Sequence, residues 1–392
     1  MPQNYTYPGV YIEEISTLPA SVIQVPTAIP AFIGVTMKTP GPLFHKITSL
    51  SDYQNLFEDD ASTSDTPQGY LGISMRLFYA NGGGEAYVYS IATNTADVTK
   101  ELFLSALTDL RNMSEPTLIA FPDAVLLADG QDQVIAATLK QCGELRNRFC
   151  IIDVPAADAL SSDNRLTAFR QLVGDDDLAY GAAYGPWLEV LSASESDSMM
   201  IPASAAIAGI YAQVDSTRGV WKAPANVTIS GIVGLSQYIN NAEQASLNID
   251  PSGAGKSINV IRRFIGKGCL VWGARTLAGD DNEWRYVPVR RLFIMIEESI
   301  RRATAFVVFE PNDANTWIKV KAMTENFLSD LWRQGALAGA KPAQAFYVNC
   351  GLGSTMTPQD ILDGRLIINV GLAAIRPAEF IITRFSHKLQ EA

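Results

Sequence analysis

The segment with the clearest chemical potential is Asp250-Pro251-Ser252-Gly253-Ala254-Gly255-Lys256-Ser257, which ends like a phosphate-binding P-loop. That motif begins with glycine where this chain has Asp250, and it follows a buried strand, so that backbone N–H groups surround the phosphates. Here the preceding residues 240–250 are polar, and an aspartate would repel a phosphate group. We therefore interpret the segment as a loop that leads into residues 258–264.

The sequence offers little else for catalysis. Its two histidines, His45 and His387, lie in a loop flanked by proline and glycine and near the C-terminal end. A Ser-His-Asp triad would depend on one of them, and no His/Cys/Asp spacing matches a metal site. The run Asn81–Gly84 is typical of a helix cap and turn. We predict no catalytic residue, no metal and no cofactor, although a site made of carboxylates alone stays open.

The composition favours a folded protein that works through assembly. The chain has 392 residues, 47% hydrophobic and 18% charged, and a net charge of -11. Because nucleic acids and anionic membranes attract clustered Lys and Arg, we expect neither nucleic-acid binding nor direct membrane insertion. The basic residues of 290–302 alternate with Glu297 and Glu298, which predicts a solvated helix face. The start lacks a basic segment followed by an apolar run, so we expect no Sec export.

Helix and strand patterns predict a mixed α/β fold. The short apolar strands 117–121 and 149–154 flank helix 131–145, an order that is typical of a parallel βαβ unit. We expect further helices at 71–79, 289–302 and 317–332, and terminal strands at 365–375 and 379–385. The predicted organisation is an N-terminal arm (1–20), a discontinuous core domain (21–95 and 231–376), an inserted α/β domain (96–230) and a C-terminal linking strand (377–392).

The N-terminal segment is unusual for the start of a globular domain. Val10 and Ile12 lie on one face of a predicted strand, and Tyr11 and Glu13 lie on the other. A tether with prolines at positions 19, 26 and 30 follows, and proline suits an extended connector better than a helix or a central strand. This arm is therefore able to reach beyond its own domain.

Several phrases spread along the chain carry a family resemblance. They are Pro8–Glu14, Asn81–Gly84, Arg218–Asn226, Val271–Leu277, Phe309–Asn312, Trp332–Gly339 and Arg376–Ile382. In this order the set resembles the tail sheath family of contractile phage tails and contractile injection systems, which includes bacteriocin-like and antifeeding-prophage-like particles. The chain is compact beside larger members of that family.

The resemblance implies a structural polymer. Sheath subunits form stacked rings or a helical lattice around an inner tube, and a change from an extended to a shorter, wider lattice drives the tube through a target envelope. The implied partners are copies of the same chain, an inner tube protein, and baseplate and terminator or cap proteins. Assembly in the bacterial cytoplasm, an outward-facing inserted domain and independence from nucleotides are also implied.

The resemblance further implies two linking arms that add strands to neighbouring subunits. The matching residues are Val10, Tyr11, Ile12, Glu13 and Ile15 in the N-terminal arm, and Glu379, Phe380, Ile381, Ile382 and Phe385 in the C-terminal strand. On helix 317–333, Lys319, Lys321 and Arg333 are the candidate contacts to the inner tube. The alternatives are edge strands within one subunit and a solvated helix face.

Two other functions remain open on sequence grounds. One is an α/β enzyme or nucleotide-binding protein, and the other is a non-contractile tube or capsid component. The sequence does not distinguish among a phage, a bacteriocin and an injection system.

Overall fold

The computed structural model of the chain describes residues 21–41, 43–58, 69–160, 163–191, 197–251, 253, 255–380 and 382. These residues form two compact units. The sheet unit contains residues 24–299, 335–338 and the C-terminal segment from 374, and the C-terminal unit contains residues 300–334 and 339–373 together with 21–23. The predictions for Val10, Tyr11, Ile12, Glu13, Ile15, Ile381 and Phe385 lie outside the described residues.

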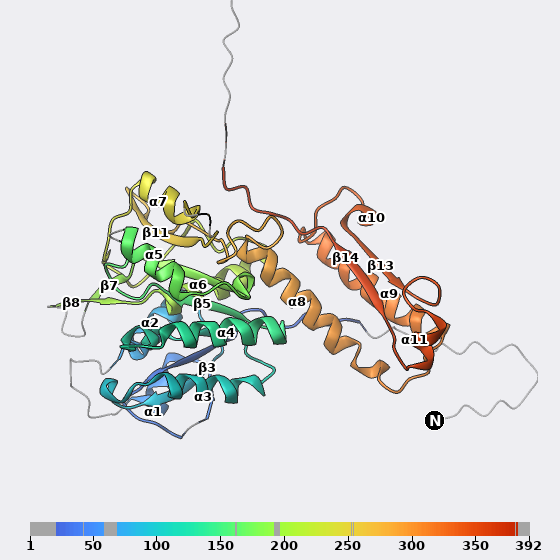
Figure 1. Ribbon diagram of the computed structural model, residues 1–392, viewed down its shortest axis with the longest axis horizontal. Coiled ribbons are helices and arrows are strands. Elements are labelled where there is room, and N and C mark those ends of the chain that lie inside the picture. Colours follow the sequence, from blue (N-terminus) through green and yellow to red (C-terminus); the bar gives the residue numbers. More distant parts are fainter. Residues whose placement is uncertain are drawn as a thin grey trace, which may run out of the picture. The chain divides into compact units, whose positions relative to one another are not determined.

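A nine-stranded mixed sheet forms the centre of the sheet unit (Figure 1). Five neighbouring pairs, β1–β3, β1–β4, β4–β5, β5–β6 and β6–β11, are parallel, whereas β2, β12 and β9 join antiparallel. In spatial order the strands are β2 (His45–Ile47), β3 (Ala86–Ala92), β1 (Pro30–Val35), β4 (Leu118–Ala120), β5 (Phe149–Asp153), β6 (Gly181–Gly185), β11 (Ile258–Phe264), β12 (Gly268–Val271) and β9 (Val227–Thr228).

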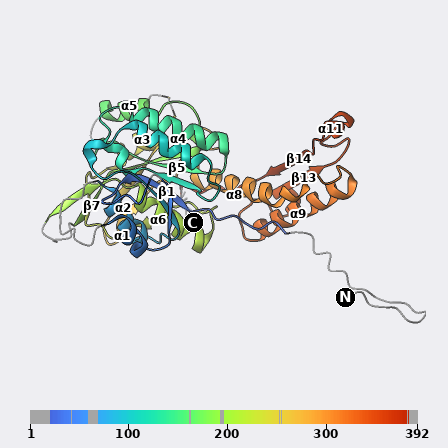
Figure 2. The same cartoon turned by 90° about the horizontal axis from the view of Figure 1, so that it is seen from below.

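Helices cover both faces of this sheet (Figure 2). One layer contains α1 (Leu50–Phe57), α2 (Leu71–Ala80) and α6 (Ser204–Arg218), and the other contains α3 (Lys100–Arg111), α4 (Gln131–Leu145) and α5 (Asp163–Leu172). Because both faces are covered, the central strands are mostly apolar, and all five residues of β5, including Asp153, are buried. The predicted mixed α/β class and βαβ unit are confirmed, and the predicted helix 131–145 coincides with α4.

One sheet joins strands from both sides of the predicted boundary at residue 95. β1 and β3 come from the range 21–95, whereas β4, β5 and β6 come from 96–230, yet β1 pairs directly with β4. Both ranges therefore share one sheet and one core instead of forming two separately packed domains. The sequence did not reveal this because chain order alone does not fix which strands are neighbours in a sheet. Whether residues 96–230 face outward stays a prediction.

Smaller elements complete the sheet unit. A three-stranded sheet has the order β10 (Gly234–Leu235), β7 (Leu188–Leu191) and β8 (Ser198–Ile201), and α7 (Asn241–Asn248) packs near β11. A capping box formed by Asn240 and Glu243 begins α7. Three cysteines, Cys142, Cys150 and Cys269, are buried free thiols, and Cys350 is a half-buried free thiol.

The C-terminal unit is built around the long helix α9 (Ala314–Arg333), which packs against β13 (Phe346–Cys350). β13 forms an antiparallel hairpin with β14 (Ile368–Leu372). The preceding helix, α8 (Val287–Ala303), begins in the sheet unit and ends in the C-terminal unit. Asp313 caps α9 by accepting from the N–H of Thr316. The short helices are α10 (Pro342–Ala345) and α11 (Pro358–Leu362). No helix within the described residues is long and apolar enough to span a membrane.

Candidate assembly surfaces

The residues that resemble a P-loop are held by contacts within the chain. Lys256 is buried, donates to the carbonyl of Arg170 at 2.8 Å and lies 2.8 Å from a carboxylate oxygen of Asp175. Arg170 in turn lies 3.1 Å from Asp250, whose side chain is fully buried. The segment leads into β11 as predicted. The lysine that would reach a phosphate is thus already occupied by internal partners.

The usual ligand position of an open parallel sheet is also filled. Ligands bind beyond the carboxyl ends of the strands where the chain reverses its direction of winding, which here is between β1 and β4. Asp123 lies there, in the 3-10 helix η2 (Pro122–Leu126), and accepts from the N–H groups of Val35 at 2.7 Å and Tyr70 at 2.5 Å. Burial raises the pKa of Asp123 to about 6, although these hydrogen bonds oppose the shift. Its carboxyl group ties β1 to the start of α2.

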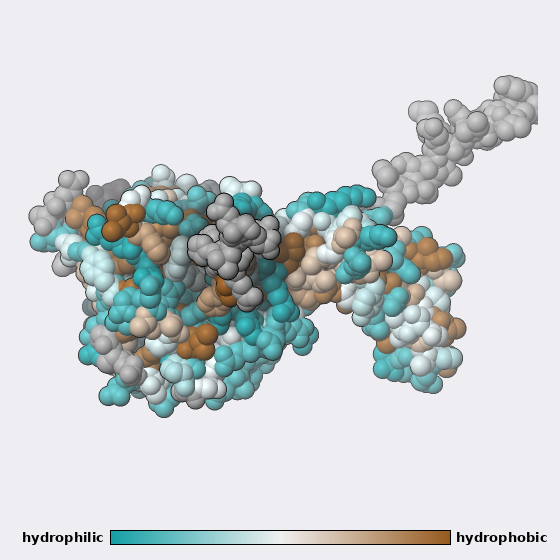
Figure 3. All heavy atoms as spheres, turned by 90° about the horizontal axis from the view of Figure 1, so that it is seen from above, coloured by the Kyte–Doolittle hydropathy of each residue, from teal (hydrophilic) through white to brown (hydrophobic). Residues whose placement is uncertain are grey.

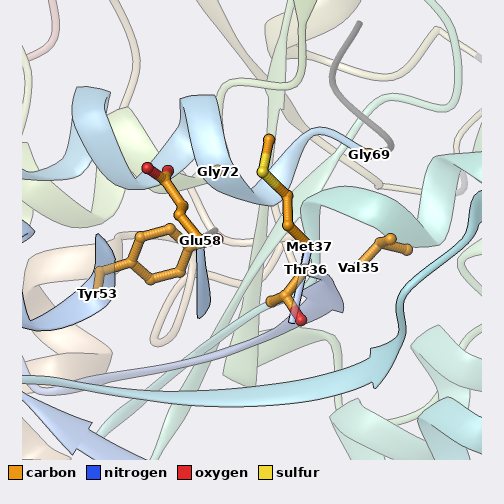
Figure 4. A pocket seen from close by; sticks show the side chains of 7 residues that line it. All are labelled: Val35, Thr36, Met37, Tyr53, Glu58, Gly69 and Gly72. Atoms are coloured by element: carbon orange, nitrogen blue, oxygen red, sulfur yellow. The ribbon is translucent and has the colours of Figure 1, made fainter. Parts of the chain in front are cut away.

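A small pocket lies beside this carboxyl group (Figure 4). Tyr53 and Glu58 line it together with residues 35–37, Gly69 and Gly72, and its volume of about 20 Å³ is close to the space of one water molecule. Among the described residues, no group of three or more His, Cys, Asp and Glu side chains is arranged to hold a metal. The geometry therefore provides no cradle for a nucleotide at this position.

The root of the N-terminal arm lies in the segment 24–29. The N–H of Val25 donates to Ser299 Oγ at 3.1 Å, and the hydroxyl of Thr27 donates to Asp215 at 2.5 Å. Arg291 donates to the carbonyl of Thr27 at 3.0 Å and forms a double hydrogen bond with Asp215 at 3.1 and 2.5 Å. The Arg291 and Asp215 side chains are only 3% and 6% exposed. Residues 24–29 are irregular, with a bend at Thr27, whereas Pro30, predicted as part of the tether, is the first residue of the central strand β1. Proline is tolerated there because the first residue of a strand need not donate to the ladder.

This root corrects one sequence interpretation. Arg290 and Arg291 were predicted to lie on a solvated face, but both are buried, and Arg290 lies over the rings of Tyr180 and Trp284. Guanidinium groups stack on aromatic faces and bind carboxylates in a planar fork, so arginine tolerates such burial. The alternating charges of the sequence concealed the partners because those partners are distant along the chain.

The root of the C-terminal arm is centred on Glu379. Its carboxylate accepts from Arg275 Nε at 3.0 and 3.2 Å and from Arg275 Nη2 at 2.6 Å. Asn248 Nδ2 donates at 2.9 Å, and the hydroxyl of Tyr286 lies at 3.3 Å. Burial alone would raise the pKa of Glu379, but the hydrogen bonds and charge of Arg275 outweigh it and hold this pKa below its usual value. We call this set of four residues the Glu379 clamp.

The predicted strand 379–385 is not present at its described positions. Glu379, Phe380 and Ile382 are in irregular structure, and the two apolar side chains are 67% and 79% exposed. Within the residues that the structure describes, these three pair with no strand, and β-structure needs a partner strand to satisfy its backbone groups. Glu379 itself faces its own sheet unit through the Glu379 clamp, which the sequence did not indicate.

The hairpin of the C-terminal unit has open edges. The N–H of Ala373 donates to the carbonyl of Ala345 at 2.8 Å, next to the hairpin pairs. In an antiparallel pair, every second residue of a strand hydrogen-bonds to the partner strand. The N–H groups of Ile368, Val370 and Leu372 therefore point away from β13. In the described part of the chain, β14 pairs with no strand other than β13. The side chains of these three residues are only half-buried, which leaves apolar surface at the edge.

The predicted tube contacts occupy two sides of α9. At 3.6 residues per turn, Lys319 and Arg333 lie within about 40° of one another, whereas Lys321 is about 160° from Lys319. Lys321 lies 3.8 Å from Glu325, and Arg333 lies 3.0 Å from Asp330. Ile318 beside Lys319 is 66% exposed, and the visible face of the molecule in Figure 3 has apolar and polar side chains interspersed. Two of the three residues thus share one side of α9, but they lie about 21 Å apart along its axis.

Comparisons with known proteins match this architecture. Family models for the phage tail sheath protein central domain and the phage tail sheath C-terminal domain match residues 96–277 and 279–388. The chain is 37% identical to a chain of the anti-feeding prophage baseplate structure, with 98% of this chain and 100% of that chain covered and a TM-score of 0.77. The chain belongs to the tail sheath family.

Two further relatives agree. This sheath subunit is 35% identical to a chain of the extracellular contractile injection system PVC sheath complex in its contracted state, with 99% of both chains covered and a TM-score of 0.77. It is also 24% identical to a putative prophage major tail sheath protein of Pseudomonas aeruginosa. The 303 aligned residues cover 75% of this chain and 71% of that protein. The predicted family and structural function are confirmed: the chain is a subunit of a contractile sheath.

Proposed function

We propose that both arms of this sheath subunit link neighbouring copies by adding strands to the β13–β14 hairpin. The open edge of β14 carries this proposal, because its outward N–H groups and half-buried apolar side chains are what an added strand would cover. The alternation of Val10 and Ile12 with Tyr11 and Glu13 suits an arm strand that packs one face against α9. Strand addition keeps subunits joined while their globular parts move.

The remaining roles follow from the same polymer. The subunit forms a homo-oligomeric sheath around an inner tube protein, with baseplate and terminator proteins at its ends, in a contractile particle assembled in the bacterial cytoplasm. Lys319 and Arg333 form the tube-facing contact, with Lys321 on a different side of α9. The subunit carries no catalytic activity, and the internal partners of Lys256 and the position of Asp123 support this. Contraction uses the difference in free energy between two lattices.

Electron microscopy of the chain co-expressed with its inner tube protein tests the linking role. Deletion of residues 2–18 is expected to abolish long cylinders while the melting temperature of the subunit stays unchanged. A deletion variant that still builds full-length, contractile sheaths would disprove the linking role of the N-terminal arm.

A substitution at the hairpin edge tests the acceptor. Val370→Pro removes an outward N–H without breaking a bond between β13 and β14, so we expect folded subunits that do not form cylinders. Val370→Ala is the matched control, because it removes side-chain packing and keeps the N–H. Normal cylinders from Val370→Pro, or equal loss from both variants, would place the acceptor elsewhere.

A further inference from the structure

The segment that follows β14 is attached to the sheet unit mainly through the side chain of Glu379. The N–H of Ile375 donates to the carbonyl of Ala336 at 3.4 Å, and beyond it no backbone–backbone hydrogen bond joins the described residues 376–380 and 382 to the rest of the unit. Glu379 is the residue of this stretch whose side chain makes hydrogen bonds. The path of the chain beyond β14 therefore depends on the Glu379 clamp.

The receiving side of the clamp is fixed independently of Glu379. The side chain of Asn259 accepts from the N–H of Arg275 and donates to its carbonyl, each at 2.7 Å. Arg275 Nη1 donates to the carbonyls of Asn248 at 3.3 Å and Gly279 at 3.4 Å. The Arg275 side chain is 4% exposed, so its Nε and Nη2 edge is a preformed, buried site for one carboxylate.

Chain order gives this site a mechanical role. β14, the proposed acceptor for a neighbour's arm, comes first, the clamp at Glu379 comes next, and the C-terminal arm follows. A pull on the arm therefore reaches the clamp before it reaches β14. If the clamp holds, the load passes into the sheet unit and the hairpin keeps its register.

We propose that Arg275 and Glu379 are positioning residues that fix the point where the C-terminal arm leaves its own subunit and isolate the β13–β14 hairpin from tension on that arm. The proposal rests on the proposed linking function. It concerns the anchoring of an arm to its own subunit, whereas strand addition concerns its attachment to a neighbour. The lowered pKa of Glu379 keeps the carboxylate charged at neutral pH.

Two measurements on the full chain test the anchor. The first is the distance distribution between nitroxide labels at Phe380→Cys and Val233→Cys, recorded by double electron–electron resonance on unassembled subunits in a Cys350→Ser background. Both label positions are exposed. The second is the rate at which assembled sheaths fall apart in urea, followed by light scattering and electron microscopy.

Glu379→Gln keeps the shape of the side chain and removes its charge. We expect a broader distance distribution. We also expect sheath dissociation that is about tenfold faster, because tension on the arm then reaches the β13–β14 hairpin, where the neighbour's arm is attached. The matched control is Glu144→Gln, which breaks the exposed Arg111–Glu144 pair at the same 2.6 Å separation and should change neither measurement. Asn248→Ala removes one donor to Glu379 and should give a smaller change in the same direction.

The outcomes separate the anchor from the linking function. A sharp distance distribution in Glu379→Gln, or dissociation at the wild-type rate, overturns the anchor. If the deletion of residues 2–18 and Val370→Pro abolish sheaths while Glu379→Gln behaves as wild type, the anchor alone is wrong. If neither of those variants affects assembly, the linking function itself is wrong, whereas the distance distribution still tests how Glu379 holds its own segment.

Discussion

The two arm roots attach to the sheet unit in different ways. At the N-terminal root the arm contributes backbone groups, the N–H of Val25 and the carbonyl of Thr27, and the body contributes buried side chains of α6 and α8. At the C-terminal root the arm contributes one carboxylate, and its backbone is free of such bonds at residues 376–380. The first root is part of the core, whereas the second is an attachment to a finished surface. Loss of the contacts at the N-terminal root should therefore lower the free energy of unfolding of the subunit. Loss of the contacts at the C-terminal root should instead change the position of the arm and the dissociation rate of the sheath.

The largest expected effect is on the N-terminal root. Asp215→Ala leaves Arg291 buried without its carboxylate partner, and breaking such a pair costs about 3–5 kcal/mol of the free energy of unfolding. Urea unfolding of the unassembled subunit measures it. Glu144→Ala, which breaks an exposed pair, is the control and should cost about 0–1 kcal/mol. Equal losses from the two variants would show that the N-terminal root is not integral to the core.

A buried carboxyl group of the core and the carboxylate of the C-terminal root should change the free energy of unfolding with pH in opposite directions. Burial raises the pKa of Asp153 to about 7, against hydrogen bonds from Ser204 and Ala203, so the folded chain retains a proton there that the unfolded chain releases above about pH 4. Stability from this group falls as pH rises from about 4 to about 7. The lowered pKa of Glu379 acts in the opposite sense, since its contribution is present above about pH 4.3 and is lost as pH falls further.

Asp153→Asn should remove on the order of 4 kcal/mol of the loss of stability between pH 4 and 7. The raised pKa of Asp123 acts in the same sense, so a smaller loss between about pH 4 and 6 should remain. Asparagine keeps an oxygen that accepts from the N–H of Ser204, now 2.7 Å from Asp153. Urea unfolding between pH 3.5 and 8 measures both effects. An unchanged pH dependence in this variant would mean that Asp153 is ionised in the folded chain.

The smallest expected effect tests one backbone contact of the N-terminal root. Ser299→Ala removes the acceptor for the N–H of Val25, a bond whose loss costs about 1 kcal/mol. The free energy of unfolding measures it, and Ser299→Cys, which keeps a weak acceptor, should cost less. A loss as large as that of Asp215→Ala would mean that the root depends on a single contact, like the C-terminal one.

Much of the fold was predictable because its signals are local. The apolar periodicity of α4 and the buried runs of β4 and β5 are set within a few residues, so the βαβ unit could be predicted. The pairing of β1 with β4 could not be predicted, because the chain forms β3 on the other side of β1 before it forms β4. The sequence therefore did not reveal that strands on both sides of residue 95 share one sheet.

The arm roots were less predictable than the arms. Prolines at 26 and 30 and the apolar alternation of Val10 and Ile12 are visible in the sequence, whereas Arg275 and Glu379 are 104 residues apart and carry no local pattern. Glu379 was expected to serve a neighbouring subunit because the family resemblance assigns it to the C-terminal linking strand, and nothing near it in the sequence indicates Arg275. Ion pairs across such separations require the fold before they can be identified.

The burial of the Glu379 clamp has a consequence for the conditions under which a sheath works. Dissolved ions screen exposed charges over a distance of about 10 Å at 0.1 M ionic strength, but they act weakly on a guanidinium group that is 4% exposed. The exposed charges on α9, including the Arg333–Asp330 pair, have no such shelter. In a particle that passes from one medium to another, the Glu379 clamp should therefore stay intact. Any contact made through the exposed charges of α9 should change in strength with the salt concentration of the medium.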